Sequence, residues 1–208
     1  DEVGLGDGKV SCMRTEETCA LGDVCAHAAS RRVRLDAVGF FKMPTADLQA
    51  ITFPGAFCYF SCGAQVAQVR GDVETGKVTV ERIVLAQDTG KTINPRGALG
   101  QVEGGCAMGF GATVMEDLVY DQDQCRAPTL AEFLVPTAMD VPEIVARIVE
   151  VPDPEGPYGA RGIGEAPISP TAGAIANAVS DALGVRLTSI PMTPERVLRA
   201  LVEQGKGG

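Results

Sequence analysis

Residues 100–111 read GQVEGGCAMGFG, and this stretch decides how the rest of the chain must pack. We expect a helix from Gly100 to about Leu118. A glycine in a helix interior costs about 1 kcal/mol relative to alanine, and this stretch carries five glycines. Such a helix is expected to be buried on its glycine face, where a large neighbour packs against bare backbone.

The segments on either side of this helix predict a sheet. β-branched and apolar residues alternate with polar ones over residues 59–69 and 77–86, and the turn sequence ETGK lies at 74–77. This pattern is typical of a β-hairpin. We expect a loop over Asp121–Pro128 and a strand over Ile144–Val151, which is ended by the turn residues of 152–157. Together these elements predict a mixed α/β (α+β) fold.

The last third of the chain predicts two helices. Ser169-Pro170 provides an N-cap and a proline at the first helical position, and Gly184 stands where a C-terminal glycine cap belongs. Thr193-Pro194-Glu195 repeats the pattern for a final helix that ends near Gly205.

The N-terminal residues 1–55 are expected to form a helix and loop region, and residues 56–208 the hairpin, the glycine-rich helix and the terminal helices. Within the first region we expect a strand over Lys9–Met13, a helix from about Thr15 to Ala29 and a loop over Met43–Pro54. The chain begins without Met, which we take to indicate a processed or truncated product.

Composition excludes two classes of function. The 208 residues include 27 acidic and 18 basic side chains, and no run of Lys and Arg is long enough to form a phosphate-binding stripe. We therefore expect no nucleic-acid partner. No apolar run reaches the roughly 18 residues that a membrane-spanning helix needs, so no membrane span is expected.

The seven cysteines form no C-x-x-C pair, which favours reduced thiols in the cytoplasm over a disulfide framework. Cys19, Cys25 and His27 could be half of a zinc site, but their spacing favours buried thiols. Cys58 and Cys62 are too sparse for an iron–sulfur site and are also expected to be core thiols. No residue of this chain is expected to ligate a metal.

The segment RGIGEAP at 161–167 is the strongest candidate in the sequence for a catalytic site. Two glycines before a carboxylate let the backbone fold tightly against a bulky neighbour and present Glu165 from a rigid loop. Burial near a cofactor would raise the pKa of that carboxyl toward neutrality, which suits a general base. The alternative is that Glu165 only complements the positive end of the following helix.

Several blocks, taken in order, resemble the C-terminal part of the molybdopterin-binding subunit of molybdenum hydroxylases, the xanthine dehydrogenase and aldehyde oxidase family. They are DTGKTINP at 88–95, GQVEGG at 100–105, PTAMDVP at 136–142, GPYGARGIGE at 156–165, ANA at 176–178 and PMTPERV at 191–197. Two earlier blocks, VGFFKMP at 38–44 and YFSCGA at 59–64, are similar to the xanthine dehydrogenase branch in particular. The fold that the resemblance implies is the C-terminal portion of the second molybdopterin-binding domain.

The resemblance implies an oxidoreductase that inserts water-derived oxygen at an electron-poor carbon, with Glu165 as the base. It implies a molybdenum–molybdopterin cofactor, for which the cytosine dinucleotide form is one alternative, with [2Fe–2S] clusters and FAD on partner chains or domains. The residues that the resemblance brings to the cofactor are Gln65, Gln101, Gly104, Gly105, Met108 and Gly164.

The chain departs from the family in two ways. The position of Met108 is commonly Gln, whose amide hydrogen-bonds the cofactor, and Met cannot donate that bond. The first molybdopterin domain and the early half of the second are absent, so the remaining part of that subunit is an expected partner. A non-catalytic fragment or assembly partner is therefore the alternative to an enzyme subunit, and a plain α/β domain whose Gly-Glu turn caps a helix is a third.

The substrate is expected to be xanthine or another purine or N-heterocycle, as the blocks at 38–44 and 59–64 indicate. Nicotinate or an aldehyde is the alternative. The residues that would discriminate between them lie mostly in the absent part of the subunit.

Overall fold

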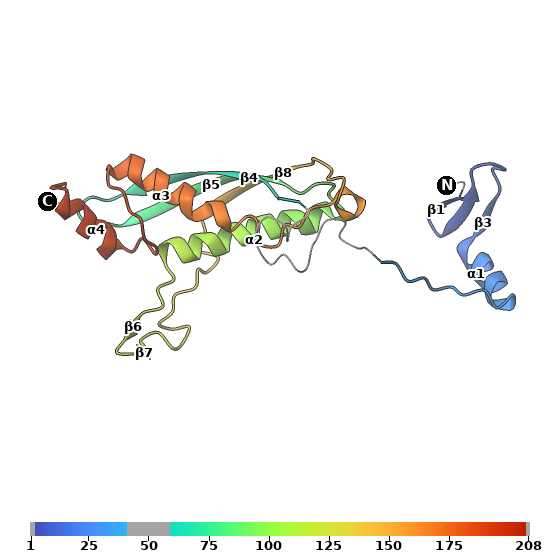
Figure 1. Cartoon of the computed structure of the whole chain (residues 1–208), viewed down its shortest axis with the longest axis horizontal. Helices are drawn as coiled ribbons and strands as arrows, with labels where there is room; N and C mark the ends of the chain where they lie inside the picture. Colours follow the sequence, from blue (N-terminus) through green and yellow to red (C-terminus); the bar gives the residue numbers. More distant parts are fainter. Residues whose placement is uncertain (1–2, 41–58, 207–208) are drawn as a thin grey trace, which may run out of the picture. The chain divides into compact units, whose positions relative to one another are not determined.

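The computed structural model describes residues 3–40 and 59–206, and the chain divides into two units, residues 1–42 and 43–208 (Figure 1). The expected boundary at 55/56 and the expected loop over Met43–Pro54 lie outside the described residues. Each unit is described by itself.

The first unit is a three-stranded antiparallel sheet followed by a helix. Its strands are β1 (Val3–Gly6), β2 (Lys9–Cys12) and β3 (Thr18–Ala20), and its helix is α1 (Leu21–Ser30). The strand expected over Lys9–Met13 is confirmed. The helix expected from Thr15 is wrong at its start, because residues 18–20 pair with β2 instead and the helix begins only at Leu21.

The second unit is built on a three-stranded sheet. Strands β4 (Gly63–Gly71) and β5 (Val78–Asp88) form the expected antiparallel hairpin, and β8 (Glu143–Val149) pairs with β5 in parallel. The turn between β4 and β5 is held by Asp72, whose carboxylate accepts the backbone N–H of Glu74 at 2.9 Å. This bond is the main cause that lowers the pKa of the Asp72 carboxyl.

Three helices complete the second unit: α2 (Pro95–Val114), α3 (Ser169–Leu183) and α4 (Pro194–Glu203). Helices α2 and α3 run alongside the sheet and pack against each other (Figure 1). The core lies between the helices and one sheet face, and it includes Ile83, Leu85, Val102, Ile175 and Leu201, all fully buried. Each such side chain contributes about 1.5–3 kcal/mol through removal from water. On the other sheet face, Val66 and Val84 are exposed.

The helix ends test the predicted caps. Asn94 caps α2 by accepting the N–H of Gly97 at 3.0 Å, so α2 begins five residues earlier than expected and ends at Val114 instead of Leu118. Asn followed by Pro is itself a helix-start signal.

The predicted caps at the end of α3 and at the start of α4 are confirmed, but the predicted cap at the start of α3 is not. Gly184 ends α3 in the left-handed conformation with φ 66°, and Thr193 caps α4 by accepting the N–H of Arg196. The N-cap expected at Ser169 is wrong. A turn that ends at Ile168 already has helical backbone angles, so Ser169 lies inside the helix and its side chain makes no cap bond.

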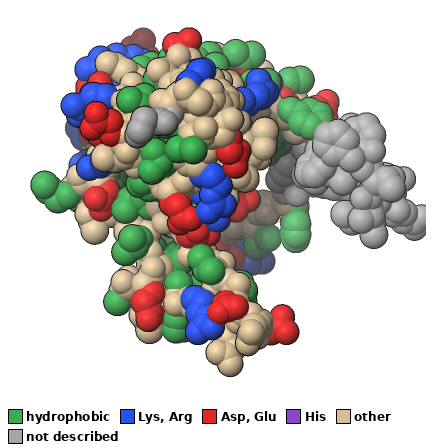
Figure 2. Space-filling model, turned by 90° about the vertical axis from the view of Figure 1, so that its left-hand side faces the viewer, with side chains coloured by type: hydrophobic (Ala, Val, Ile, Leu, Met, Phe, Trp, Pro, Cys, Tyr) green, Lys and Arg blue, Asp and Glu red, His purple; other side chains and the backbone are tan. Residues whose placement is uncertain are grey.

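Between α2 and β8 lies a long connection, residues 116–142, which we call the arm. It contains a short hairpin of β6 (Tyr120–Asp121) and β7 (Gln124–Cys125), where a loop was expected. Leu130 and Met139 on the arm are 78% and 92% exposed. The space-filling view shows apolar, basic and acidic side chains intermixed over the arm and over the end of the unit that carries α4 (Figure 2). Among the described helices, none has the length and hydropathy to cross a membrane.

Candidate active site

The loop that carries Glu165 connects β8 to α3, and its beginning is joined to the segment that follows β5. The backbone N–H of Arg161 donates to the Thr89 carbonyl at 2.9 Å, and that of Lys91 donates to the Gly159 carbonyl at 2.6 Å. Gly90 lies between them with φ 64°, and a Cβ there would clash with the Gly159 carbonyl oxygen. The glycine is therefore required for this close approach.

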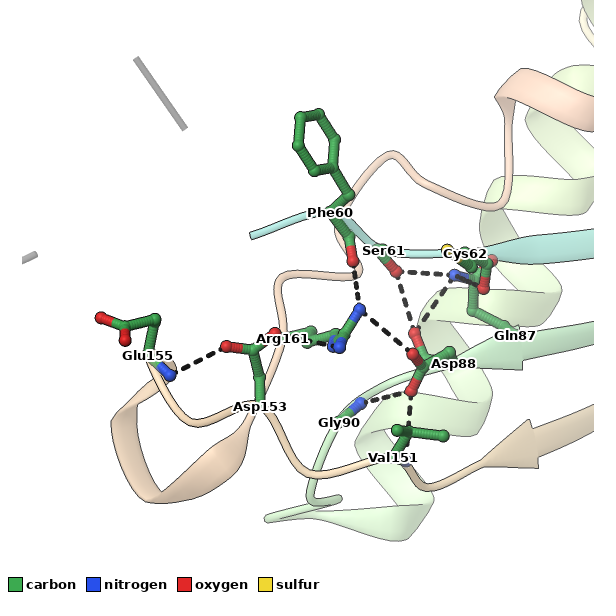
Figure 3. A network of polar contacts seen from close by, with 10 residues as sticks. All are labelled: Phe60, Ser61, Cys62, Gln87, Asp88, Gly90, Val151, Asp153, Glu155 and Arg161. Carbon is green, nitrogen blue, oxygen red and sulfur yellow. Dashed lines mark hydrogen bonds and ion pairs between the residues drawn. The ribbon is translucent and has the colours of Figure 1, made fainter. Parts of the chain in front are cut away.

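The Arg161 side chain lies at the centre of a polar cluster (Figure 3). Its guanidinium is 3.3 Å from a carboxylate oxygen of Asp88 and 2.9 Å from one of Asp153, and it also donates to the Phe60 carbonyl. The three charged side chains are only 15%, 12% and 9% exposed. The arginine thus joins the ends of β4, β5 and β8 at one point.

Asp88 is held from its other side as well. Its second carboxylate oxygen accepts the N–H of Gly90 at 2.9 Å and that of Val151 at 3.3 Å. The Asp88 carbonyl accepts the Ser61 hydroxyl at 2.9 Å, and Ser61 in turn accepts from the fully buried Gln87 at 2.8 Å (Figure 3). Because buried polar groups are costly unless paired, this network fixes one arrangement of the loops.

The other end of the glutamate loop is held at Pro167, which is buried. Its carbonyl accepts the Gln65 amide N–H at 2.7 Å and the Thr171 hydroxyl at 3.0 Å. Gly105 of α2 lies against the same proline, since a Cβ at Gly105 would be 3.0 Å from the Pro167 Cβ. Gln65 and Gly105, both expected to face the cofactor, therefore meet the loop just after Glu165.

Glu165 itself is exposed. Its backbone carbonyl accepts the N–H of Ile168 at 3.1 Å, but its carboxylate has no hydrogen bond or ion pair within the described part of the chain. No bond from it reaches the first turn of α3, so no contact supports the alternative of a helix-end complement. Gly164 is also exposed, with nothing within 4 Å of the position of a Cβ.

A hollow of about 360 Å³ lies beside this loop. Small residues line it, at the start of β4, on the loop and at the start of α3: Ser61, Gly63, Ala166, Ser169 and Pro170.

The remaining expected cofactor residues lie on the outward face of α2. Gln101, Gly104 and Met108 are exposed, at the three- and four-residue spacing that gives one helix face, and Met108 is 63% exposed. The adjacent, buried face carries Gly105 and Gly109, and a Cβ at Gly109 would lie 2.6 Å from the Thr171 Cβ. The expected close packing against glycine is thus confirmed for one face, where α3 is the neighbour.

The burial expected of Cys19, Cys25 and Cys62 is not found, although another thiol, Cys106, lies in the core. Cys106 is buried, and burial raises the pKa of its thiol to about 11. Cys19 and Cys62 are exposed and Cys25 is intermediate, so the expectation of buried thiols is wrong for Cys19 and Cys62. Cys58 lies outside the described residues. Within the described ranges, no group of three or more His, Cys, Asp or Glu side chains could hold a metal ion.

Sequence reasoning missed the roles of Arg161, Asp88 and Asp153. All three lie inside or beside the blocks quoted above, yet none was given a role. The signal available was chemical: an arginine within a Gly-rich loop that packs closely needs carboxylate partners. The acidic residues that end β5 and follow β8 are the nearest candidates in a sheet where those strands are parallel neighbours.

Comparison with known proteins identifies the family. The family model described as "Molybdopterin cofactor-binding domain" matches residues 1–142, more than half of the chain. The chain therefore belongs to this family, and the resemblance seen in the sequence is confirmed. Glu165 lies beyond the matched residues.

Three similar proteins illustrate the range of the family. The xanthine dehydrogenase molybdenum-binding subunit of Escherichia coli O157:H7 is 37% identical over 153 residues, which are 73% of this chain and 20% of that protein. The aldehyde oxidoreductase of Megalodesulfovibrio gigas is 37% identical over 146 residues, 70% of this chain and 16% of that protein. The crystal structure of quinoline 2-oxidoreductase from Pseudomonas putida 86 superposes with a TM-score of 0.74 at 28% identity, covering 97% of this chain and 26% of that one. The chain thus spans at most about a quarter of the length of these proteins. The superposition confirms the mixed α/β fold.

The described residues fit one side of a bound molybdopterin. Gly104 and Gly164 leave open space where a Cβ would be, so a flat ring can approach bare backbone at both places. The exposed Gln101 amide offers donors and an acceptor. The Oε1 atom of Gln65 is buried and has no hydrogen-bond partner in the described part of the chain, which leaves an acceptor beside the glutamate loop.

Proposed function

We propose that this chain forms one side of the active site of a molybdopterin-dependent hydroxylase, with Glu165 as its catalytic base. The observation that carries the proposal is the presentation of Glu165. Its carboxylate is exposed and unpaired within the described residues, yet its loop is held at Arg161 and at Pro167. A carboxylate without an internal partner, on a fixed loop beside a hollow, is available to a reacting group.

The reaction breaks one C–H bond and forms one C–O bond with an oxygen from water, releasing two protons and two electrons. When bound, the molybdenum cofactor activates the water-derived oxygen and takes up the two electrons. Glu165 accepts the proton of that oxygen as the C–O bond forms. Because the bound cofactor would make that oxygen more acidic, the Glu165 carboxylate would be a sufficient base, and such a base contributes roughly 10²–10⁴-fold in rate.

The outward face of α2 is the surface that we assign to the pterin. Gln101 supplies hydrogen bonds, Gly104 allows close approach, and Met108 offers an apolar surface in place of an amide. Gly164, which lies on the glutamate loop, allows close approach in the same way. Gln65 and Gly105 act through their contacts at Pro167. The cofactor can be the cytosine dinucleotide form.

The partners that we propose are the rest of the molybdopterin-binding subunit and chains or domains that carry [2Fe–2S] clusters and FAD. The similarity to a protein named as a molybdenum-binding subunit supports this. The free thiols of the described cysteines support a cytoplasmic location.

Xanthine or another purine or N-heterocycle is the substrate class that we propose. The names of the E. coli and Pseudomonas putida proteins support it, because one acts on xanthine and the other on quinoline. Nicotinate or an aldehyde is the alternative, and the Megalodesulfovibrio gigas protein supports the aldehyde. Comparing kcat/KM for xanthine, nicotinate and benzaldehyde with the assembled enzyme separates these classes.

The test of the base is Glu165→Gln in the assembled enzyme purified from its own host. We expect molybdenum and pterin content to stay at the wild-type level while kcat falls about 10²–10⁴-fold. The matched control is Glu74→Gln, the same change at an exposed glutamate in the turn between β4 and β5. Loss of turnover in both variants, or in neither, would overturn the assignment.

A non-catalytic role has one observation in its favour, which is Met108 where the family commonly has Gln. Its exposed thioether cannot donate a hydrogen bond to a pterin. Metal analysis of the native assembly decides between the two functions. Molybdenum with pterin supports the enzyme, and protein from its own host with neither supports the non-catalytic role.

A further inference from the structure

We propose that Arg161 is a positioning residue, which holds the loop of residues 162–166 and thereby sets where the Glu165 carboxylate lies. The structural part of this inference stands on contacts within this chain. Its consequence for turnover rests on the proposed function of Glu165.

The first step is that Arg161 is bound from several directions at once. Its guanidinium meets carboxylates of Asp88 and Asp153 at 3.3 Å and 2.9 Å and donates to the Phe60 carbonyl (Figure 3). With the arginine side chain 15% exposed, solvent screens these interactions only weakly. Three acceptors on three separate segments of the chain therefore determine where this residue lies.

The second step is that the arginine balances two buried negative charges. Asp88 and Asp153 are 12% and 9% exposed, and Arg161 lies within 4 Å of both. Removing the guanidinium would leave two carboxylates facing each other with little water, and like charges so placed repel. The segments after β5 and after β8 would then separate, and these are the segments that carry the start of the glutamate loop.

The third step is that the loop has little other support before Pro167. Between Arg161 and Pro167 lie two glycines: nothing lies within 4 Å of a Cβ at Gly164, and only the Tyr59 hydroxyl lies at 4.0 Å from one at Gly162. Ile163 and Ala166 are half-buried, but Gly162, Gly164 and Glu165 are exposed, and glycines give the segment around them many accessible conformations. Its two ends, held by Arg161 and by the bonds from Gln65 and Thr171 to Pro167, therefore limit where Glu165 can lie.

Arginine is suited to this role in a way that lysine is not. The planar guanidinium presents donors in fixed directions to several acceptors, whereas an ammonium is a compact point charge on a flexible stem. Arg161→Lys keeps the charge between the aspartates but cannot reproduce the same set of directed bonds. It should therefore restore only part of what Arg161→Gln loses.

The experiment uses the assembled enzyme with Arg161→Gln, Arg161→Lys and the control Arg82→Gln. Arg82 also forms an ion pair across two strands, with Glu143 at 2.7 Å, but its side chain is 48% exposed. We expect kcat to fall about tenfold to a hundredfold in Arg161→Gln, with a smaller change in KM, wild-type molybdenum content and a smaller loss in Arg161→Lys. The control should match the wild type.

Two readouts separate positioning from general damage. Amide hydrogen exchange over residues 162–166 should be faster in Arg161→Gln, while exchange in β5 is unchanged. In a Glu165→Gln background, Arg161→Gln should cause no further loss of turnover, because its effect passes through the carboxylate that is already gone. Unchanged exchange in the loop, or the same fold-loss in both backgrounds, would overturn the inference.

The same variants distinguish a failure of the Glu165 assignment from a failure of the Arg161 inference. If Glu165→Gln keeps wild-type turnover, Glu165 is not the base, and hydrogen exchange alone then decides whether Arg161 holds the loop. If Arg161→Gln does not assemble, Asp153→Asn is the second variant, because it removes one of the two carboxylate partners and leaves Asp88. Faster exchange over 162–166 in that variant supports the inference, and wild-type exchange overturns it.

Discussion

The glutamate loop and the arm are both irregular connections of the second unit, but they are held in different ways. In the loop, Arg161 is 15% exposed and binds two carboxylates that are themselves nearly buried. In the arm, Arg126 pairs with Asp121 while the two side chains are 54% and 56% exposed. Exposed pairs contribute little and are screened by salt, whereas a buried pair that loses one partner is costly. An irregular connection is therefore fixed where its charged side chains are buried and paired.

The largest expected effect comes from removing a carboxylate of the buried cluster. Asp88→Ala should lower the free energy of unfolding by about 3 kcal/mol, because it leaves a buried guanidinium with one partner fewer and two backbone N–H groups without an acceptor. Urea unfolding of the purified chain measures this. A loss below about 1 kcal/mol would contradict the difference between the loop and the arm.

The packing of α2 against α3 supports the end of the glutamate loop at Pro167, and this packing can be tested at Gly109. A valine there would meet Thr171, whose Cβ is 2.6 Å from the position of the new Cβ. Gly109→Val should therefore destabilise the fold by about 1–3 kcal/mol. Gly104→Val on the outward face is the control for stability, since a Cβ at Gly104 has nothing within 4 Å. Equal losses of stability in the two variants would contradict the assignment of the two faces.

Cys106 in the core and Cys125 in the arm allow the same chemistry to be compared in both regions. Burial raises the pKa of the Cys106 thiol from 9.0 to about 11, so at pH 8 about one thiol in a thousand is ionised. Because the folded pKa is raised, the stabilisation from the neutral thiol is fully present below about pH 9 and is lost as pH rises toward 11. Iodoacetamide should alkylate Cys125 well before Cys106, and stability should fall less between these pH values in Cys106→Ala. Faster labelling of Cys106 would contradict its burial.

The smallest effect is expected in the arm. Arg126→Ala should change the free energy of unfolding by less than about 1 kcal/mol, since its ion pair with Asp121 is exposed. Thermal unfolding at low and high salt measures the change. A loss as large as that of Asp88→Ala would show that the arm is held as firmly as the loop.

Much of the fold could be predicted from the sequence because its elements carry local signals. The hairpin of β4 and β5, the glycine at the end of α3 and the Thr193 cap of α4 follow from alternation and capping chemistry within a few residues. The errors lie where distant pairing overrides a local pattern. Residues 18–20 look helical, but the edge of β2 pairs with them. The turn at Glu165–Ile168 makes Ser169 the first residue of α3, where an N-cap was expected.

The residues of the candidate site also fall into those that the sequence could predict and those that it could not. Glu165 could be found because two glycines precede it and because its block resembles a known family. For Arg161 the sequence offered only its need for carboxylate partners. That these are Asp88 and Asp153 depends on strand ends that only the folded chain brings together. Gln65, which was expected at the cofactor, donates a hydrogen bond to Pro167, 102 positions away in the sequence. No local pattern carries a contact at that separation.

The central claim is that Glu165 is the base, and the most direct test is the rate at which substrate reduces the assembled enzyme in a single turnover. Wild type and Glu165→Gln are mixed with xanthine at equal molybdenum content, and the bleaching of the iron–sulfur and flavin absorbance is followed. Reduction is expected to be slower by about 10²–10⁴-fold in the variant, with the same final extent. Reduction at the wild-type rate would contradict it.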